Sequence, residues 1–147
     1  MAQQYEQLLL KNQICFPLYA CGRKIVGAYT PYLKPLGLTY TQYIVLMVLW
    51  EHGSVNVGQL GATLLLDAGT LTPLLKRMEQ SGLVTRERSK EDERITIVTI
   101  TEEGEKLKEK CKDIPMAMSS TGACLTDKEK TELYRILYKL IDEGGRS

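Results

Sequence analysis

The 147-residue sequence predicts a mainly α-helical fold with a small β-hairpin, of the winged helix-turn-helix kind. One observation is an amphipathic helix over about residues 70–80 that ends at Gly82. A second is the pair of strand-like segments at 83–88 and 95–100, joined by a charged loop. A hydrophobic content of 44% is ample for one packed domain of this length.

The N-terminal segment 5–28 is predicted to form one helix that is apolar around much of its circumference. A helix with one face exposed to solvent does not need apolar side chains on all sides, so we expect part of this helix to contact a partner subunit. Pro31 and Pro35 are expected to break the chain after it. The sequence Thr39–Gln42 is typical of a capping box and starts a second helix.

The middle of the chain predicts a helix-turn-helix. Gly53 ends the second helix, residues 54–57 form a short strand, and Asn56 caps a short helix. With Thr70 as the next cap, Pro73 falls in the first turn of the following helix, where its missing N–H costs little. The predicted inner face of this helix is Leu71, Leu74, Leu75 and Met78.

Two further helices are predicted at the C-terminal end. Thr101 caps a charged helix that runs to about Ile114, before Pro115, and a last helix begins at the capping box Thr126–Glu129. The whole chain is thus expected to be a single domain of residues 1–147. Within it the DNA-binding unit is 39–101, and the dimerisation helices lie in 1–36 and 102–147.

The composition excludes several classes of protein. The net charge is only +1, so any basic footprint for nucleic acid must be local. The N-terminus lacks the features of a secretory signal, and the apolar run 43–50 is too short to span a bilayer. We therefore expect a cytoplasmic protein with no membrane partner.

Neither a metal site nor a catalytic site is predicted. The four cysteines show no Cys-x-x-Cys spacing, and His52 is the single histidine. No nucleophile elbow or phosphate-binding glycine loop occurs, and no cysteine has the surroundings of a thiol peroxidase. We expect no cofactor and no enzymatic activity.

The local basic footprint lies on the 70–80 helix and the hairpin. Residues 70–90 carry five basic and two acidic side chains. The expected contacts to double-stranded DNA are Thr70, Thr72, Lys76 and Arg77 on the helix, and Arg86, Arg88 and Arg94 on the hairpin. Arg94 suits a minor groove, and Asp92 is interpreted as the internal partner that holds an arginine. A surface hairpin of mixed charge remains the alternative.

These residues carry a family resemblance. The run 67–84 and the loop Asp92–Arg94 resemble the MarR family of bacterial transcription regulators, and nearly the whole chain fits. The resemblance implies a homodimer that places two recognition helices in successive major grooves of a palindromic operator, with Arg94 in the flanking minor groove. It adds Asp67 and Asp92 to the DNA-binding set. Ala68 stands where close relatives have serine, so one phosphate contact is expected to be lost.

Cys15 is the candidate switch. In a continuous helix, Lys11 and Tyr19 share its face, and both would favour the reactive thiolate. From spacing alone, a buried cysteine that acts as a small apolar core residue is the commoner outcome.

A second resemblance favours the switch. Asn12–Phe16, Leu18–Ala20 and Leu38–Tyr43 are similar to the organic-hydroperoxide-sensing, OhrR-type branch and to the staphylococcal thiol-based regulators. This implies that Cys15 is the redox sensor. It also implies that Tyr29 and Tyr40 hydrogen-bond its sulfur, one of them across the dimer, with Tyr19 nearby.

The thiol that would pair with oxidised Cys15 is left open. Cys21, six residues further along one helix, lies on another face and is too far to bond. Cys124 of the partner subunit and a low-molecular-weight thiol are equal candidates, and Cys111 is the weakest. Pro17 is expected to bend the helix and shift the sensor pocket.

Taken together, the sequence predicts a repressor that leaves its operator when an organic hydroperoxide oxidises Cys15. The first alternative is a regulator of the same fold gated by a small aromatic ligand, with Cys15 structural. A thiol peroxidase and a winged helix used only for protein contacts are the remaining hypotheses.

Overall fold

Helix α2 (Tyr40–His52) is the most deeply buried helix of the first part of the chain, and Val45, Leu46 and Leu49 on it have no exposed surface. The computed structural model describes residues 5–144. The chain divides into two compact units, residues 1–113 and 114–147, each of which is described by itself.

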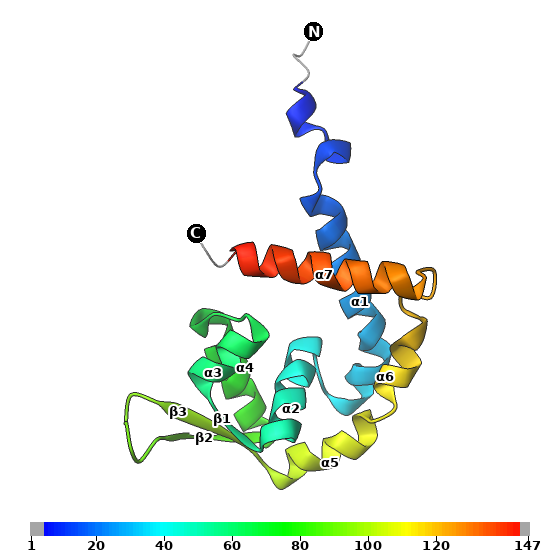
Figure 1. Cartoon of the computed structure of the whole chain (residues 1–147). Helices are drawn as coiled ribbons and strands as arrows, with labels where there is room; N and C mark the ends of the chain where they lie inside the picture. Colours follow the sequence, from blue (N-terminus) through cyan, green and yellow to red (C-terminus); the bar gives the residue numbers. More distant parts are fainter. Residues whose placement is uncertain (1–4, 145–147) are drawn as a thin grey trace. The chain divides into compact units, whose positions relative to one another are not determined.

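Figure 1 shows the order of the elements along the chain. In the first unit they are η1 (Glu6–Leu8), η2 (Leu10–Asn12), α1 (Cys15–Leu33), η3 (Lys34–Leu36), α2, β1 (Ser54–Asn56), α3 (Val57–Leu64), α4 (Ala68–Gln80), β2 (Val84–Arg88), β3 (Thr96–Ile100) and α5 (Glu102–Cys111). The second unit holds α6 (Ile114–Ala117), η4 (Met118–Ser120) and α7 (Asp127–Gly144).

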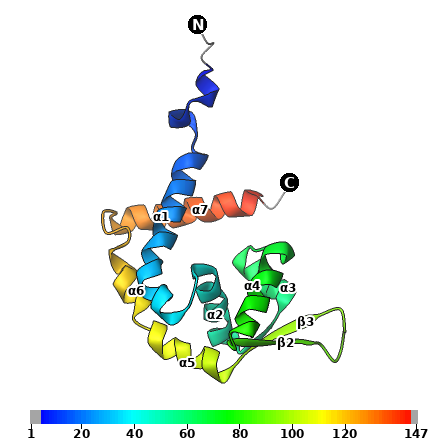
Figure 2. The same ribbon diagram turned by 180° about the vertical axis from the view of Figure 1, so that it is seen from behind.

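The three strands form one antiparallel sheet in the order β1-β3-β2. Val84 pairs with Ile100 and Arg88 with Thr96, so β2 and β3 form the predicted hairpin, while β1 pairs Val55 with Val98. The hairpin projects beyond the helices of its unit, as both views show (Figures 1 and 2). The predicted fold class, mainly helical with a small winged hairpin, is confirmed.

The core of the first unit lies between α2, α3, α4 and the sheet. The predicted inner face of α4 is confirmed, because Leu71, Leu74, Leu75 and Met78 are all buried. The side chains that complete this core without measurable exposure are Leu60 of α3 and Val98 of β3. Together these contacts fix α4 against α2 and the hairpin, so α4 is presented on a rigid base.

The N-terminal prediction of one helix over 5–28 is wrong at both ends. Two short 3-10 turns precede α1, which begins only at Cys15 and runs to Leu33. Pro17 therefore lies in the first turn, where its missing N–H costs little, and the predicted bend does not arise. Pro31 lies inside α1 and does not break the chain as predicted.

Helix α4 begins earlier than predicted. Asp67 is its N-cap, not Thr70, and the helix runs from Ala68. Pro73 consequently lies inside the helix and not in its first turn. The predicted stop is confirmed, since Gly82 has a φ of 75°, in the left-handed region that favours glycine after a helix.

The capping predictions elsewhere are confirmed. Thr39 and Gln42 form a reciprocal capping box, and Thr101 caps α5 through the N–H of Gly104. Helix α5 ends at Cys111, three residues earlier than predicted, and Pro115 lies within α6. In the second unit, Thr126 and Glu129 bond each other at the start of α7.

Large apolar side chains remain exposed on two helices. On α1 they include Phe16, Leu18, Tyr19, Ile25 and Val26, and on α7 they include Leu133, Ile136, Leu137, Leu140 and Ile141. Such surfaces are expected to be covered in an assembly. Among residues 5–144, no helix is both long enough and apolar enough to cross a membrane.

A glycine on α5 provides a test of this packing. A Cβ at Gly104 would lie 2.4 Å from the carbonyl oxygen of Leu83 and 2.8 Å from Cγ1 of Ile100. We expect Gly104→Ala to reduce the free energy of unfolding by about 1–3 kcal/mol, measured by urea denaturation. Gly27→Ala on α1, where nothing lies within 4 Å, is the matched control and should not destabilise the protein. Equal stability of the two variants would contradict this packing.

Candidate nucleic-acid interface and thiol site

A tight turn joins α3 to α4. The side chain of Asn56 caps α3 by accepting the N–H of Gly58 at 2.7 Å. At the other end Leu65 has a φ of 56°, and the N–H of Leu66 donates to the carbonyl of Gly61 at 2.9 Å. A Cβ at Gly61 would lie 2.8 Å from the carbonyl oxygen of Leu66, so the turn requires a glycine there. This turn sets the direction in which α4 leaves α3.

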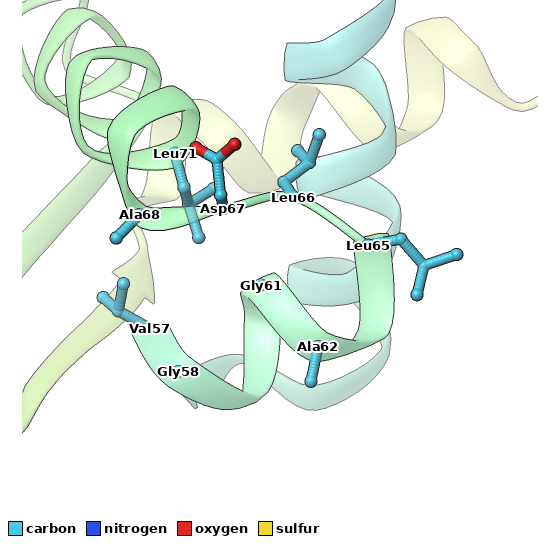
Figure 3. A pocket seen from close by; sticks show the side chains of 9 residues that line it. All are labelled: Val57, Gly58, Gly61, Ala62, Leu65, Leu66, Asp67, Ala68 and Leu71. Carbon is cyan, nitrogen blue, oxygen red and sulfur yellow. The ribbon is translucent and has the colours of Figure 1, made fainter. Parts of the chain in front are cut away.

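Asp67 fixes the start of α4. Its Oδ1 accepts the backbone N–H of Thr70 at 2.7 Å. Figure 3 shows the carboxylate beside an open hollow of about 340 Å³ between α3 and the start of α4. Asp67 is the only residue with a polar side chain among those that line the hollow. The hollow therefore offers few groups that could orient a polar ligand.

The outward side of α4 carries the predicted contact residues. Thr70, Thr72, Lys76 and Arg77 are all exposed, opposite the buried leucine face. Hydroxyls near the N-terminal end of a helix can approach base edges or phosphates, and the two cations can neutralise phosphates. The structure thus places these four side chains on one accessible surface.

Arg86 has a partner inside the fold. Its Nη2 lies 2.8 Å from Oε2 of Glu79, Nε donates to the same oxygen, and the backbone N–H of Arg86 donates to Oε1. These bonds to Arg86 lower the pKa of the Glu79 carboxyl. Since the Arg86 side chain is only 24% exposed, its first role is to join α4 to β2.

The hairpin of β2 and β3, residues 84–100, is called the wing. Its loop is ordered by a second ion pair. Nη2 of Arg94 lies 2.9 Å from Oδ2 of Asp92, while Nε and the backbone N–H of Arg94 both donate to Oδ1 at 3.0 Å. These bonds lower the pKa of Asp92. The interpretation of Asp92 as the partner of an arginine is confirmed. The Arg94 side chain is nevertheless 90% exposed, so it is accessible at the tip.

Arg88 is exposed on the same wing. Its Nη1 donates to the carbonyl of Glu93 at 3.2 Å, which ties the end of β2 to the loop. Ser89 adds a turn bond, because its Oγ accepts the N–H of Glu91. The loop is therefore shaped by its own side chains before any ligand binds.

Cys15 is the first residue of α1 and is exposed. Lys11 lies in the separate turn η2, so the expected helical face shared by Lys11 and Cys15 does not exist. Tyr19 does follow one turn after Cys15 in α1, and the guanidinium of Arg23 lies 5.4 Å from its ring centroid. Exposure within the chain contradicts the alternative of a cysteine packed in the core of one subunit.

The tyrosines form a cluster at the other end of α1. The ring of Tyr29 lies 4.9 Å from that of Tyr40 and 5.8 Å from that of Tyr43, which is 6.3 Å from Trp50. Burial, and then the neighbouring Tyr29, raise the pKa of Tyr40. Tyr40 therefore keeps its proton at neutral pH and can donate a hydrogen bond.

This cluster cannot reach the sulfur of its own chain. Tyr29 follows Cys15 by fourteen residues on one helix, a rise of about 21 Å at 1.5 Å per residue. Tyr40 contacts Tyr29, so it lies at the same distant end. The expectation that only one of the two tyrosines acts across a dimer is therefore wrong. If they serve Cys15, both must do so from the partner subunit.

The remaining thiols differ in accessibility. Cys21 lies in α1 with Cys15 and on another face, so the two cannot bond within a chain. Cys111 is 2% exposed, and burial raises the pKa of its thiol. Cys124 is exposed in the turn before α7. Within residues 5–144 no group of three or more metal-ligating side chains comes together.

Comparison with known proteins identifies the family. The model of the transcriptional regulator SarA/Rot family matches residues 28–111, more than half of the chain. Over 143 residues the chain is 46% identical to the organic hydroperoxide resistance transcriptional regulator of Bacillus subtilis, covering 95% of this chain and 97% of that protein. The chain belongs to the OhrR-type branch of the MarR family of transcriptional regulators.

Solved structures agree with membership of this OhrR-type branch. A structure of reduced AbfR bound to DNA has a TM-score of 0.75 and 37% identity, covering 94% of this chain and 96% of that chain. AbfR, a protein of Staphylococcus epidermidis, has also been solved overoxidised on DNA and in a disulfide form. MarR of E. coli shares the fold, with a TM-score of 0.65 and 24% identity over 87% of this chain and 96% of that chain.

The Glu79–Arg86 pair of this OhrR-type regulator gives a test by pH. The pKa of Glu79 is lowered from 4.5 in the folded state, so its contribution to stability is present in full above pH 4.5 and is lost as the pH falls through the lowered value. We expect Glu79→Gln to be less stable than the wild type near neutral pH, and the difference to shrink on acidification below pH 4.5. Urea denaturation at a series of pH values measures this difference.

The matched control is Glu87→Gln, which removes an exposed carboxylate from β2. Its difference from the wild type should vary less with pH. A constant difference for Glu79→Gln over the acid range would show that the pair does not stabilise the fold through charge.

Proposed function

We propose that this OhrR-type regulator is a homodimeric repressor that leaves its operator when an organic hydroperoxide oxidises Cys15. The observation that supports the proposal best is the exposed thiol at the start of α1, with the phenol cluster near the other end of that helix. The cluster can serve that thiol only across a dimer, so a redox change there acts on the interface that spaces the two DNA-binding units.

DNA binding is assigned to α4 and the wing. In this proposal α4 enters the major groove with Thr70, Thr72, Lys76 and Arg77, while Arg94 enters the flanking minor groove. Asp67 and Asp92 act through their neighbours, one as the cap of α4 and the other by holding Arg94. Arg88, exposed on the same wing, is assigned a phosphate contact, whereas Arg86 positions β2 through Glu79.

The chemistry at Cys15 follows from the thiol. The thiolate attacks one peroxide oxygen, the O–O bond breaks, and the alkoxide leaves and takes a proton to give the alcohol. The sulfur becomes a sulfenic acid, which condenses with a second thiol to give a disulfide and water. We keep Cys124 of the partner subunit and a low-molecular-weight thiol as candidates, since Cys124 is exposed and Cys111 is buried.

The coupling to DNA runs through α2. Tyr40 and Tyr43 are on α2, and α2 packs against both α3 and α4. Oxidation removes an acceptor from the partner's phenols and adds bulk, so the position of α2 changes and the spacing of the two α4 helices with it. A misplaced half-site loses several phosphate contacts at once.

We further propose that the protein works in the cytoplasm, where its DNA target lies. The alternative of a regulator gated by a small aromatic ligand predicts that Cys15 is dispensable for release. The peroxide experiment below separates the two.

Replacing the thiol tests the switch. We expect Cys15→Ser to bind operator DNA as the wild type does, and to stay bound in cumene hydroperoxide concentrations that release the wild type. Serine lacks the oxidisable sulfur while it keeps the size of the side chain. Cys21→Ser, an exposed thiol on the same helix, is the control and should respond normally. Release of the serine variant at the wild-type concentration of peroxide would rule out this sensor.

Replacing Arg94 in the loop of the wing tests the DNA interface. We expect Arg94→Ala to weaken operator binding, and to reduce the slope of log K against log salt by about 1, because one fewer cation meets the DNA. Fluorescence anisotropy at several salt concentrations measures both quantities. Lys110→Ala removes one exposed positive charge from α5 and is the matched control. An unchanged affinity and slope for Arg94→Ala would favour a wing used for protein contacts.

A further inference from the structure

One carboxylate joins the end of α4 to the edge of the sheet. Oε2 of Glu79 accepts Nη2 of Arg86 at 2.8 Å and Nε at 3.2 Å, and Oε1 accepts the backbone N–H of Arg86 at 3.1 Å. Because β2 is an edge strand, the carboxylate takes the place that a carbonyl of a further strand would occupy. The pair therefore holds both the side chain and the backbone of the strand.

The pair is a second point of attachment between α4 and the wing. The first is the turn after α4, where the N–H of Leu83 donates to the carbonyl of Met78 at 3.0 Å. A strand that is attached only at its base can still tilt. Attachment at Arg86, two residues beyond the start of β2 at Val84, fixes the direction of the strand as well.

The direction of β2 matters because the wing is long. Both views show the hairpin projecting beyond the helices of its unit (Figures 1 and 2). Over Val84–Arg88 the strand extends about 13 Å at 3.3 Å per residue, so a tilt of about 10° moves its far end by about 2 Å. A displacement of that size breaks a hydrogen bond. Arg94 lies in the loop beyond this end and would move with it.

The pair itself brings little net charge to DNA. Its two charges are opposite and lie 2.8 Å apart, so their fields largely cancel at a distance. The Arg86 side chain is 24% exposed, whereas that of Arg94 is 90% exposed. Direct contact is therefore expected from Arg94, and the pair is left with a role in geometry.

We propose that Glu79 and Arg86 hold the wing at a fixed angle to α4, so that the major-groove and minor-groove contacts of one half-site form together only on DNA of the matching shape. The two are positioning residues, and they contribute to the choice of sequence without reading a base. A wing that is fixed before binding also loses less conformational freedom on the DNA. The proposal rests on the DNA interface assigned above to α4 and the wing, and it does not depend on Cys15.

Removing the carboxylate separates position from charge. The probe is a duplex selected by the wild-type protein from a random-sequence library, compared with a duplex of the same base composition in scrambled order. Loss of a negative charge alone should strengthen binding to both duplexes. We nevertheless expect Glu79→Ala to bind the selected duplex about tenfold more weakly, because the wing is no longer ordered before binding. Its affinity for the scrambled duplex should not fall.

Glu87→Ala is the matched control. Glu87 is an exposed carboxylate next to Arg86 in β2, and its side chain lies on the opposite face of the strand. This variant loses the same charge, and it should bind both duplexes at least as tightly as the wild type does. Equal changes in Glu79→Ala and Glu87→Ala would show that only charge counts, and would overturn the proposal.

A lysine in place of Arg86 separates positioning from direct contact. Arg86→Lys keeps the positive charge, but lysine lacks the planar fork that donates twice to Oε2 of Glu79. We expect this variant to lose affinity for the selected duplex as Glu79→Ala does. The double variant should bind no more weakly than either single variant. Wild-type affinity in Arg86→Lys, or additive losses in the double variant, would show that Arg86 contacts DNA itself and overturn the proposal.

The two duplexes also separate this proposal from the one on which it rests. A wild-type protein that binds both alike would have no sequence preference, and the proposed binding to an operator would fail. A wild-type preference that Glu79→Ala and Arg86→Lys keep in full would leave the interface intact and overturn the positioning role. Loss of folded protein weakens binding to both duplexes by the same factor, so it cannot imitate the expected loss of preference.

Discussion

The length of helix α1 is the constraint on which the thiol site depends. Helix α1 holds Cys15 and the Tyr29–Tyr40 contact about 21 Å apart, and no rotation of side chains can close that distance. A single chain therefore carries the thiol near one end of α1 and the phenols near the other. In the function proposed above the site is complete only in a dimer, so oxidation of the sulfur is an event at the subunit interface.

The aromatic cluster connects α1 to α2. Tyr29 of α1 contacts Tyr40 and Tyr43 of α2, and Trp50, near the end of α2, donates from Nε1 to the carbonyl of Gly104 at 3.0 Å. The same helix buries Val45, Leu46 and Leu49 in the core that supports α4. Because a close-packed core does not deform continuously, a shift at the tyrosines has to move α2 with its neighbours.

The sequence predicted the elements whose signals are local. The leucine face of α4 and the capping boxes at Thr39 and Thr126 follow from spacing alone, and all were found. The choice of Thr70 over Asp67 as a cap failed because both residue types cap helices well, and only the backbone decides between them. The partnership of Arg86 with Glu79 depends on how the turn at Gly82 returns the chain, which residue spacing does not reveal.

The ion pair between Asp92 and Arg94 weakens the attraction of Arg94 to DNA, but it fixes the position of the Arg94 side chain. Asp92 offsets part of the charge that Arg94 would bring to a minor groove, and the net charge of the chain is only +1. A fixed arginine, however, loses less conformational freedom on binding than a mobile one. Elsewhere, Lys106 of α5 pairs with Glu103 and Arg135 of α7 with Glu132, so part of the positive charge on these helices is offset within the chain. In the function proposed above, affinity depends on where α4 and the wing are held, so a change at the dimer interface is enough to release the operator.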